Sequence, residues 1–168
     1  MSTEFNPLAP LVGPCVIALV LTAAATDIQW RRIPNWLTFG AWLLAWPVQI
    51  CLHGFQAGTW TWALGWLTGF FLFLPFYLLR GMAAGDVKLI AAVGAWLGAG
   101  MALRITLATF VLGGLWGIAA AIRSGQGRQL FESVTGVVRT GRGMPSVGTL
   151  PYGVAIAAGT VGMLFMSV

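Results

Sequence analysis

Charged residues are scarce in this chain of 168 residues, where Asp, Glu, Lys and Arg together make up 8%. Apolar residues make up 58% and the mean hydropathy is +0.86, which is more apolar surface than a soluble domain of this length needs for one core. The sequence therefore predicts that lipid surrounds most of the chain. The few basic residues fall in short gaps between apolar runs and form no basic stripe with aromatics, which argues against nucleic-acid binding.

Metal-ligating and nucleophilic side chains are equally few. The chain has one histidine, His53, and two cysteines, Cys15 and Cys51, which stand far apart inside apolar runs and form no CxxC or other zinc spacing. We expect no metal and no other cofactor, and we interpret both cysteines as small buried hydrophobic residues. A catalytic triad would need His53, which is expected on the opposite side of the membrane from the two aspartates described below.

Six charge-free stretches are long enough to cross a bilayer as helices, which takes about 17 to 25 apolar residues. They cover approximately residues 8–26, 35–52, 57–79, 87–103, 105–122 and 150–168. Because the runs do not alternate polar with apolar residues as barrel strands do, we predict an all-α membrane protein, a single domain with a polytopic bundle of about six transmembrane helices. Arg104 alone separates the fourth and fifth spans, and a tight glycine-containing turn or one longer broken helix also fits there. Five or seven spans are the alternatives.

The basic residues indicate the orientation of these spans, because eight of the nine fall on one side and Arg104 falls on the other. The eight are Arg31, Arg32, Arg80, Lys88, Arg123, Arg128, Arg139 and Arg142. The positive-inside rule predicts that this side is the cytoplasmic face of the inner membrane and that both termini lie outside. Residues 123–149 carry apolar residues at helical spacing, so we expect a cytoplasmic amphipathic helix in the interface there.

Four acidic residues remain to be explained. Glu4 lies in the N-terminal tail and Glu132 in the amphipathic segment, where a solvated charge is the ordinary explanation. Asp27 ends the first span and Asp86 opens the fourth, both at the predicted cytoplasmic face, and an ionisable residue at a membrane boundary is by default a functional hypothesis. A structural explanation stays open for each: Asp86 as a helix cap, and Asp27 in a salt bridge with Lys88 or an arginine of the following loop.

The sequence around each aspartate resembles the type IV prepilin peptidase family, which are membrane-embedded aspartic proteases with a GxGD-type motif. DIQWRRIPNWLT, from Asp27, has the aspartate shortly before R-x-I-P-N, and GMAAGDVKL, from Gly81, has most of GxGD with the following lysine. LPYGVAIAAG, from Leu150, matches a late Pro-Tyr-Gly, so the resemblance covers nearly the whole chain in order and spacing. The sequence departs from the family at Ala83, where GxGD has its first glycine, and a backbone with negative φ tolerates that alanine.

The resemblance implies an activity and a set of site residues. Asp27 and Asp86 would be catalytic, with Gly85, Lys88, Arg32, Pro34 and Asn35 supporting the motifs. The substrate would be a type IV prepilin or pseudopilin, cleaved just after a glycine where its leader meets an apolar helix at the cytoplasmic membrane face, for pilus biogenesis or type II-like secretion.

Longer members of the family carry an N-terminal cytoplasmic insertion with paired CxxC motifs, and they also methylate the new N-terminus. Here eight residues, Asp27 to Pro34, separate the first two predicted spans, and CxxC is absent. We therefore interpret the chain as the short, peptidase-only form, similar to those of Flp-type pili in tight-adherence systems, without N-methyltransferase activity.

Two carboxyl groups hydrolyse a peptide bond when one is ionised and takes a proton from water while the other is protonated and polarises the carbonyl. Gly85 would let a peptide backbone approach Asp86, and Pro34 would stop the first motif from continuing as helix. Lys88 is interpreted as a lipid-headgroup contact or topology signal, with tuning of the pair as the alternative. Asn35 is open between a helix-start hydrogen bond and a site role.

Two other functions remain open from residue types alone. One is a non-catalytic membrane scaffold of a pilus or secretion assembly, and the other is a proton-coupled transporter that uses the two aspartates as a relay. A proton relay across the bilayer would require acidic residues at several depths, and the predicted spans contain none at mid-depth.

Overall fold

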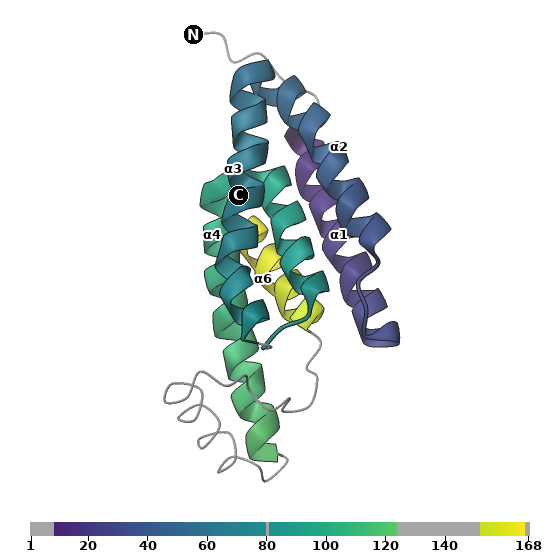
Figure 1. Ribbon diagram of the computed structural model, residues 1–168, viewed down its shortest axis with the longest axis vertical. Coiled ribbons are helices and arrows are strands. Elements are labelled where there is room, and N and C mark those ends of the chain that lie inside the picture. Colours follow the sequence, from purple (N-terminus) through teal and green to yellow (C-terminus); the bar gives the residue numbers. More distant parts are fainter. Residues whose placement is uncertain (1–8, 80, 124–151, 167–168) are drawn as a thin grey trace.

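The computed structural model describes residues 9–79, 81–123 and 152–166, and the regular elements in these ranges are all helices (Figure 1). They are α1 (Ala9–Trp30), α2 (Asn35–His53), α3 (Phe55–Leu78), α4 (Ala84–Arg123) and α6 (Tyr152–Met166). The all-α fold class is confirmed. The predicted amphipathic segment at 123–149 lies, beyond Arg123, outside the described residues.

Apolar surface covers the outside of this bundle. Large side chains more than half exposed include Trp36, Leu44, Phe71 and Leu115, and soluble monomers rarely show apolar patches of such extent. Within the described residues, three helical stretches are long and apolar enough to cross a membrane: Pro10–Trp30, Phe55–Leu78 and Ala84–Ala119. The helix α6 is apolar but shorter. The fold is that of a membrane protein, and the count of six spans stays a prediction.

Lipid also explains where the cysteines lie. Cys15 and Cys51 are both exposed on the bundle, so their interpretation as buried residues is wrong. In water a small apolar side chain gains by facing inward, whereas in a bilayer the outside of the helix is as apolar as the inside. Hydrophobicity alone therefore does not assign a face of a membrane helix.

The helix α4 consists of two arms joined at Gly98, where φ is 80° and ψ is 170°. A Cβ placed on Gly94 would lie 3.1 Å from the Cβ of Ala102, although residues eight apart in a straight helix are separated by about 12 Å along its axis. The chain therefore reverses direction, and the arms 84–97 and 99–123 lie side by side (Figure 1). The boundary predicted at Arg104 is wrong, and the glycine-containing turn considered as its alternative is the one found. A reversal this tight needs a residue that reaches positive φ, which the position of a charge does not reveal.

The first arm of α4 packs backbone to backbone against α3. A Cβ on Gly65 would collide with the carbonyl of Gly94, and a Cβ on Gly94 would collide with the carbonyl of Gly65. Such close approach of two backbones is typical of small residues at helix interfaces in membranes. Gly98 also takes part in this contact, because a Cβ on Gly65 would lie 3.0 Å from Gly98 Cα, and it makes the reversal as well.

Gln49 of α2 satisfies backbone carbonyls that the reversal leaves open. The carbonyls of Ala95 and Trp96 lie just before Gly98, where the regular helical partners four residues on are lost. The Gln49 side chain, 3% exposed, donates from Nε2 to the carbonyl oxygens of Trp96 at 2.6 Å and Ala95 at 3.4 Å. Because unpaired polar groups are costly in an apolar interior, this amide supports the turn.

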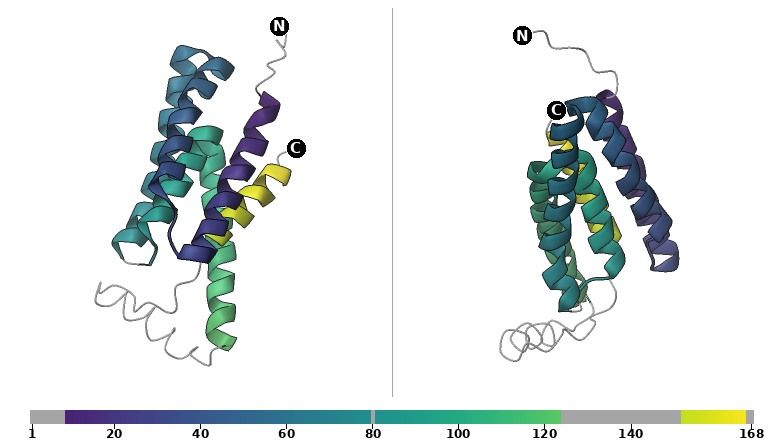
Figure 2. Two further views of the ribbon diagram at one scale, coloured as in Figure 1. Left: turned by 90° about the vertical axis from the view of Figure 1, so that its right-hand side faces the viewer. Right: turned by 45° about the horizontal axis from the view of Figure 1, so that its top comes forward.

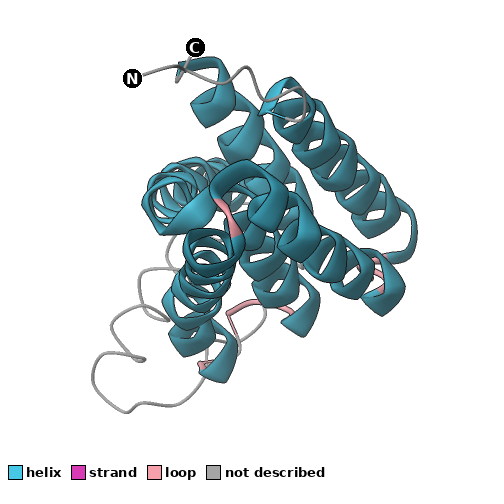
Figure 3. Ribbon diagram, turned by 90° about the horizontal axis from the view of Figure 1, so that it is seen from above, coloured by secondary structure: helices cyan, strands magenta, loops and turns pink. Residues whose placement is uncertain are grey.

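The packing of the remaining helices places four helix termini at one end of the bundle. α6 lies against both α1 and α4, whereas α2 packs on α3 and α4 and scarcely meets α1. The C-terminal end of α1 and the N-terminal ends of α2, α4 and α6 lie at the same end of the bundle (Figure 2). Seen from above, the helices form an irregular cluster rather than flat layers (Figure 3). Both aspartates singled out above belong to the end where these four helix termini meet.

Candidate active site

Asp27 lies in the last turns of α1 and is 9% exposed. Its carboxylate oxygen Oδ2 accepts a hydrogen bond of 3.0 Å from the backbone N–H of Gly153, in the first turn of α6. A Cβ on Gly153 would lie 2.9 Å from that oxygen, so a side chain there would have to displace the carboxylate. Four residues after the aspartate, Arg31 adopts φ 53° and donates its N–H to the Asp27 carbonyl at 2.9 Å, which ends α1.

Asp86 is the third residue of α4 and is 4% exposed. Its Oδ2 accepts a hydrogen bond of 3.2 Å from the N–H of Ala83, while its own N–H donates to the Ala83 carbonyl at 3.1 Å. A carboxylate that reaches back to the residue before a helix forms one half of a capping box. The helix-cap explanation for Asp86 is thus confirmed as one of its roles.

Ala83, the departure from GxGD, fits this geometry without strain. Among non-glycine residues in the described ranges, positive φ occurs at Arg31, and Ala83 does not share it. A glycine would be required there only for a positive φ or for a close approach of backbone. Alanine at this position therefore leaves the turn before Asp86 intact.

The two carboxyl groups belong to one cluster. Asp86 interacts electrostatically with Asp27, and Tyr152, the first residue of α6, interacts electrostatically with Asp86. Gly113 of α4 makes room for the tyrosine, since a Cβ on this glycine would lie 3.1 Å from Tyr152 Cε1. Each carboxylate faces the N-terminus of a helix, where free N–H groups and the positive end of the macrodipole stabilise negative charge.

Tyr152 and Gly153 were not assigned to the site from the sequence. The signal was present, because the LPYG stretch from Leu150 is one of the three points of resemblance. Its physical role could not be derived without coordinates, since 126 residues separate Gly153 from the aspartate that it binds. The glycine brings α6 onto Asp27, and the tyrosine beside it interacts electrostatically with Asp86.

Gly85 and Pro34 organise the loop between α1 and α2. A Cβ on Gly85 would lie 3.1 Å from Ile33 Cβ, so the side chain of Ile33 fills the room that we expected for a peptide backbone. Pro34, with φ −62° and ψ 135°, is the residue from which α2 starts, and its carbonyl accepts from the N–H of Leu37 at 3.2 Å. α1 already ends at Arg31, and Pro34 marks the start of α2, whereas Gly85 packs against Ile33 of the loop between them.

Lys88 and Asn35 form a polar pair that ties α4 to α2. Lys88 Nζ donates to Asn35 Oδ1 at 2.9 Å, so this lysine does not need Asp27 as its partner. The start of α2 has no side-chain cap, and Asn35 therefore does not make the helix-start hydrogen bond considered above. Arg32 lies exposed in the loop between α1 and α2.

Comparisons with known proteins identify the family of this chain. Residues 15–118 match the type IV leader peptidase family. The chain belongs to this family. It is 32% identical over 166 residues to the prepilin leader peptidase/N-methyltransferases of Burkholderia pseudomallei strains 1026b and K96243, covering 94% of this chain and 47% of each relative. The chain thus spans about half the length of the curated relatives it matches. No solved structure matches it.

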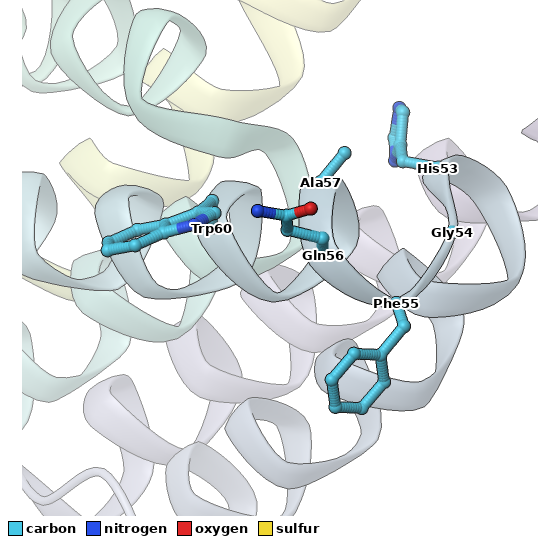
Figure 4. A pocket seen from close by; sticks show the side chains of 6 residues that line it. All are labelled: His53, Gly54, Phe55, Gln56, Ala57 and Trp60. Carbon is cyan, nitrogen blue, oxygen red and sulfur yellow. The ribbon is translucent and has the colours of Figure 1, made fainter.

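Membership of the type IV leader peptidase family, with the apolar helices, makes the chain a multi-pass protein of the inner membrane. Among the described residues, two hollows lie at different places. One, of about 560 Å³, surrounds the turn between α2 and α3 and is lined by His53, Gly54 and Phe55 among others (Figure 4). Because α2 is about 27 Å long, this turn is remote from the aspartates at the other end. In the described ranges no three His, Cys, Asp or Glu side chains gather as metal ligands.

The second hollow, about 360 Å³, lies beside the start of α4. Its residues are Asn35, Thr38, Phe39 and Trp42 of α2, Trp66 and Phe70 of α3, and Lys88 and Ala91 of α4. We call it the aromatic groove. Two residues along a helix are separated by about 200° of rotation, so Lys88 and Asp86 face different sides of α4. The groove is therefore distinct from the carboxylate cluster.

Proposed function

We propose that this member of the type IV leader peptidase family is an aspartic endopeptidase that removes the leader from type IV prepilins or pseudopilins, with Asp27 and Asp86 as its catalytic pair. The observation that carries the proposal is the burial of two electrostatically interacting carboxyl groups, 9% and 4% exposed, at one end of an apolar bundle. Burying two interacting carboxyl groups is costly unless they are paired with donors or with each other. A site that tolerates this arrangement is suited to holding one proton between two acids.

The reaction follows from that shared proton. The ionised carboxyl group takes a proton from water as the oxygen attacks the scissile carbonyl carbon, while the protonated carboxyl group polarises the carbonyl oxygen. Collapse of the tetrahedral intermediate breaks the C–N bond, and the leaving amine receives a proton from the acid. Gly153 supports this chemistry by fixing the orientation of Asp27 through its N–H. The pair acts as one unit, with either aspartate as the base.

The substrate is expected to reach the pair from the membrane. A prepilin carries a short basic leader followed by an apolar helix, so its cleavage site lies at the bilayer edge while the helix stays in lipid. We propose the topology predicted from the basic residues: six crossings in a single domain over 1–168, both termini outside, and Asp27 and Asp86 at the cytoplasmic face. The 123–149 segment would lie on that same face.

We infer that the chain does not transfer methyl groups. The relatives from B. pseudomallei are named for both activities, but the linker from α1 to α2 comprises residues 31–34 and has no CxxC. It therefore has no room for the cysteine-containing insertion that accompanies methylation in longer family members. Incubation with a cleaved pilin and a methyl donor, followed by mass spectrometry of the new N-terminus, tests this directly.

The decisive experiment co-expresses the chain with candidate prepilins and follows leader removal by gel shift and mass spectrometry. Asp27→Asn and Asp86→Asn are each expected to lower cleavage at least about 100-fold, because each removes a general acid or base. Glu132→Gln, an acid-to-amide change outside the two motifs, is the control and should cleave as wild type. Full cleavage by either aspartate variant, once inserted in the membrane, would contradict the proposal. Loss of proton-coupled uptake with cleavage retained would favour the transporter, and no cleavage by wild type would favour the scaffold.

A further inference from the structure

The aromatic groove has an apolar wall and a charged end. The rings of Trp42 and Trp66 lie 6.2 Å apart, and Trp66 stacks on Phe70 at 5.1 Å, so aromatic faces line the groove along α2 and α3. At one end stands Lys88, exposed and hydrogen-bonded to Asn35. An amphipathic ligand with one negative end matches both features.

The size of the aromatic groove favours an extended hydrocarbon chain over an α-helix as its ligand. One turn of an α-helix with its side chains, about 10 Å wide and 5.4 Å high, occupies roughly 420 Å³. The groove of about 360 Å³ is smaller than this single turn. A substrate helix would rest on its rim, whereas an extended hydrocarbon chain can enter between the rings.

The positive charge at the mouth of the aromatic groove favours an anionic ligand. Lys88 is the only lysine in the chain, and Arg31 and Arg32, both exposed, precede Asn35 by a few residues at the same end of the bundle. Basic side chains at the mouth of a pocket between membrane helices suit the phosphate of an anionic lipid. We propose that the aromatic groove binds an anionic phospholipid, with an acyl chain against the rings and its phosphate on the Lys88 ammonium.

Such a lipid would stabilise the junction beside the carboxylate cluster. Lys88 and Asn35 join α4 to the first turn of α2, and Ile33, two residues earlier, packs on Gly85. A phosphate that binds both the Lys88 ammonium and the Asn35 amide would hold the loop between α1 and α2 in place next to Asp86. Binding itself does not depend on peptidase activity, so it can be measured whether or not cleavage is found.

The single lysine makes the test specific. Reductive ¹³C-methylation keeps the charge and labels Lys88 and the N-terminal amine, and the Lys88→Gln variant identifies which NMR signal is which. Titration with phosphatidylglycerol in mixed micelles should move the Lys88 signal saturably, and phosphatidylcholine should not. Inorganic phosphate at the same concentration should have no effect, because it lacks the acyl chain.

Variants then test each half of the site by native mass spectrometry. Lys88→Gln should weaken phosphatidylglycerol binding about fivefold, with Arg104→Gln as the control that removes one charge elsewhere. Phe39→Ala should also weaken it, whereas Phe71→Ala, which removes a ring of similar exposure on α3, should not: the two rings are 57% and 59% exposed.

Three results would overturn the lipid site. They are equal affinity for the two lipids, unchanged phosphatidylglycerol binding in both Lys88→Gln and Phe39→Ala, and a Lys88 signal that responds to phosphate alone as it does to lipid. A signal that a prepilin peptide moves and phosphatidylglycerol does not would equally overturn it, and would assign the groove to the substrate.

Discussion

Replacing Gly153 by alanine is expected to displace Asp27 without removing any atom of either carboxyl group. The added Cβ would lie 2.9 Å from Asp27 Oδ2 and 3.1 Å from its Cβ. Because the end of α1 is buried, the Asp27 carboxylate has to move rather than the helix. The 3.0 Å hydrogen bond from the Gly153 N–H would then be broken or bent. A hydrogen bond to a charged group contributes about 1.5–3 kcal/mol. If the transition state needs this orientation of Asp27, kcat/KM should fall roughly 10- to 150-fold.

The assay is cleavage of a purified prepilin by the detergent-solubilised variant, with kcat and KM determined separately. Gly162→Ala is the matched control, because it is the same substitution in the same helix and its Cβ would meet nothing within 4 Å. The loss at Gly153 should fall mainly on kcat, since the substrate-binding surface is unchanged. Thermal unfolding in the same detergent shows whether the variant is folded.

A folded Gly153→Ala variant that cleaves at the wild-type rate would refute the positioning of Asp27 by α6. A loss of activity that Gly162→Ala shares would equally count against it, because the effect would then come from the helix as a whole. Loss at Gly153 alone, with unfolding temperatures alike in all three proteins, is the expected pattern.

Two further predictions concern the reversal in α4 and are measured by thermal or denaturant unfolding in detergent. Gln49→Leu should lower stability by about 1–3 kcal/mol, because it leaves buried carbonyls without donors, whereas Gln56→Leu, at an exposed position of α3, should change it little. Gly98→Ala should cost about 1–3 kcal/mol, because its φ of 80° and ψ of 170° belong to a region open essentially to glycine. Gly100→Ala, whose Cβ would meet nothing within 4 Å, should be neutral or slightly stabilising, and a neutral Gly98→Ala would mean that the reversal does not need glycine.

The carboxylate pair could be predicted from the sequence because acids are so rare in it. The chain has four acidic residues. The position of each relative to the apolar runs was enough to predict that Asp27 and Asp86 lie at the same end of the bundle. Motif spacing then added the residues nearby in sequence. Contacts made across the whole chain, such as that of Gly153 with Asp27, have no local pattern, so they needed the three-dimensional packing of α6.

Local geometry inside apolar runs was the part that sequence patterns could not resolve. The reversal at Gly98 was predicted six residues too late, at Arg104, because hydropathy has no minimum at a glycine between alanines and leucines. The polar partner of Lys88 also escaped prediction, since 53 residues separate it from Asn35. Lipid removes the contrast between a buried and an exposed apolar face, and with it the signal on which periodicity depends.

The docking of α6 has a pharmacological consequence. The helix α1 carries one carboxylate and packs on α6, while its contact with α4, which carries the other, is slight. The distance between the two carboxyl groups therefore depends on how α6 packs between α1 and α4. A small apolar compound lodged between α1 and α6 would widen this gap from within the bilayer. We expect such compounds to inhibit non-competitively, without resembling a peptide or touching either acid.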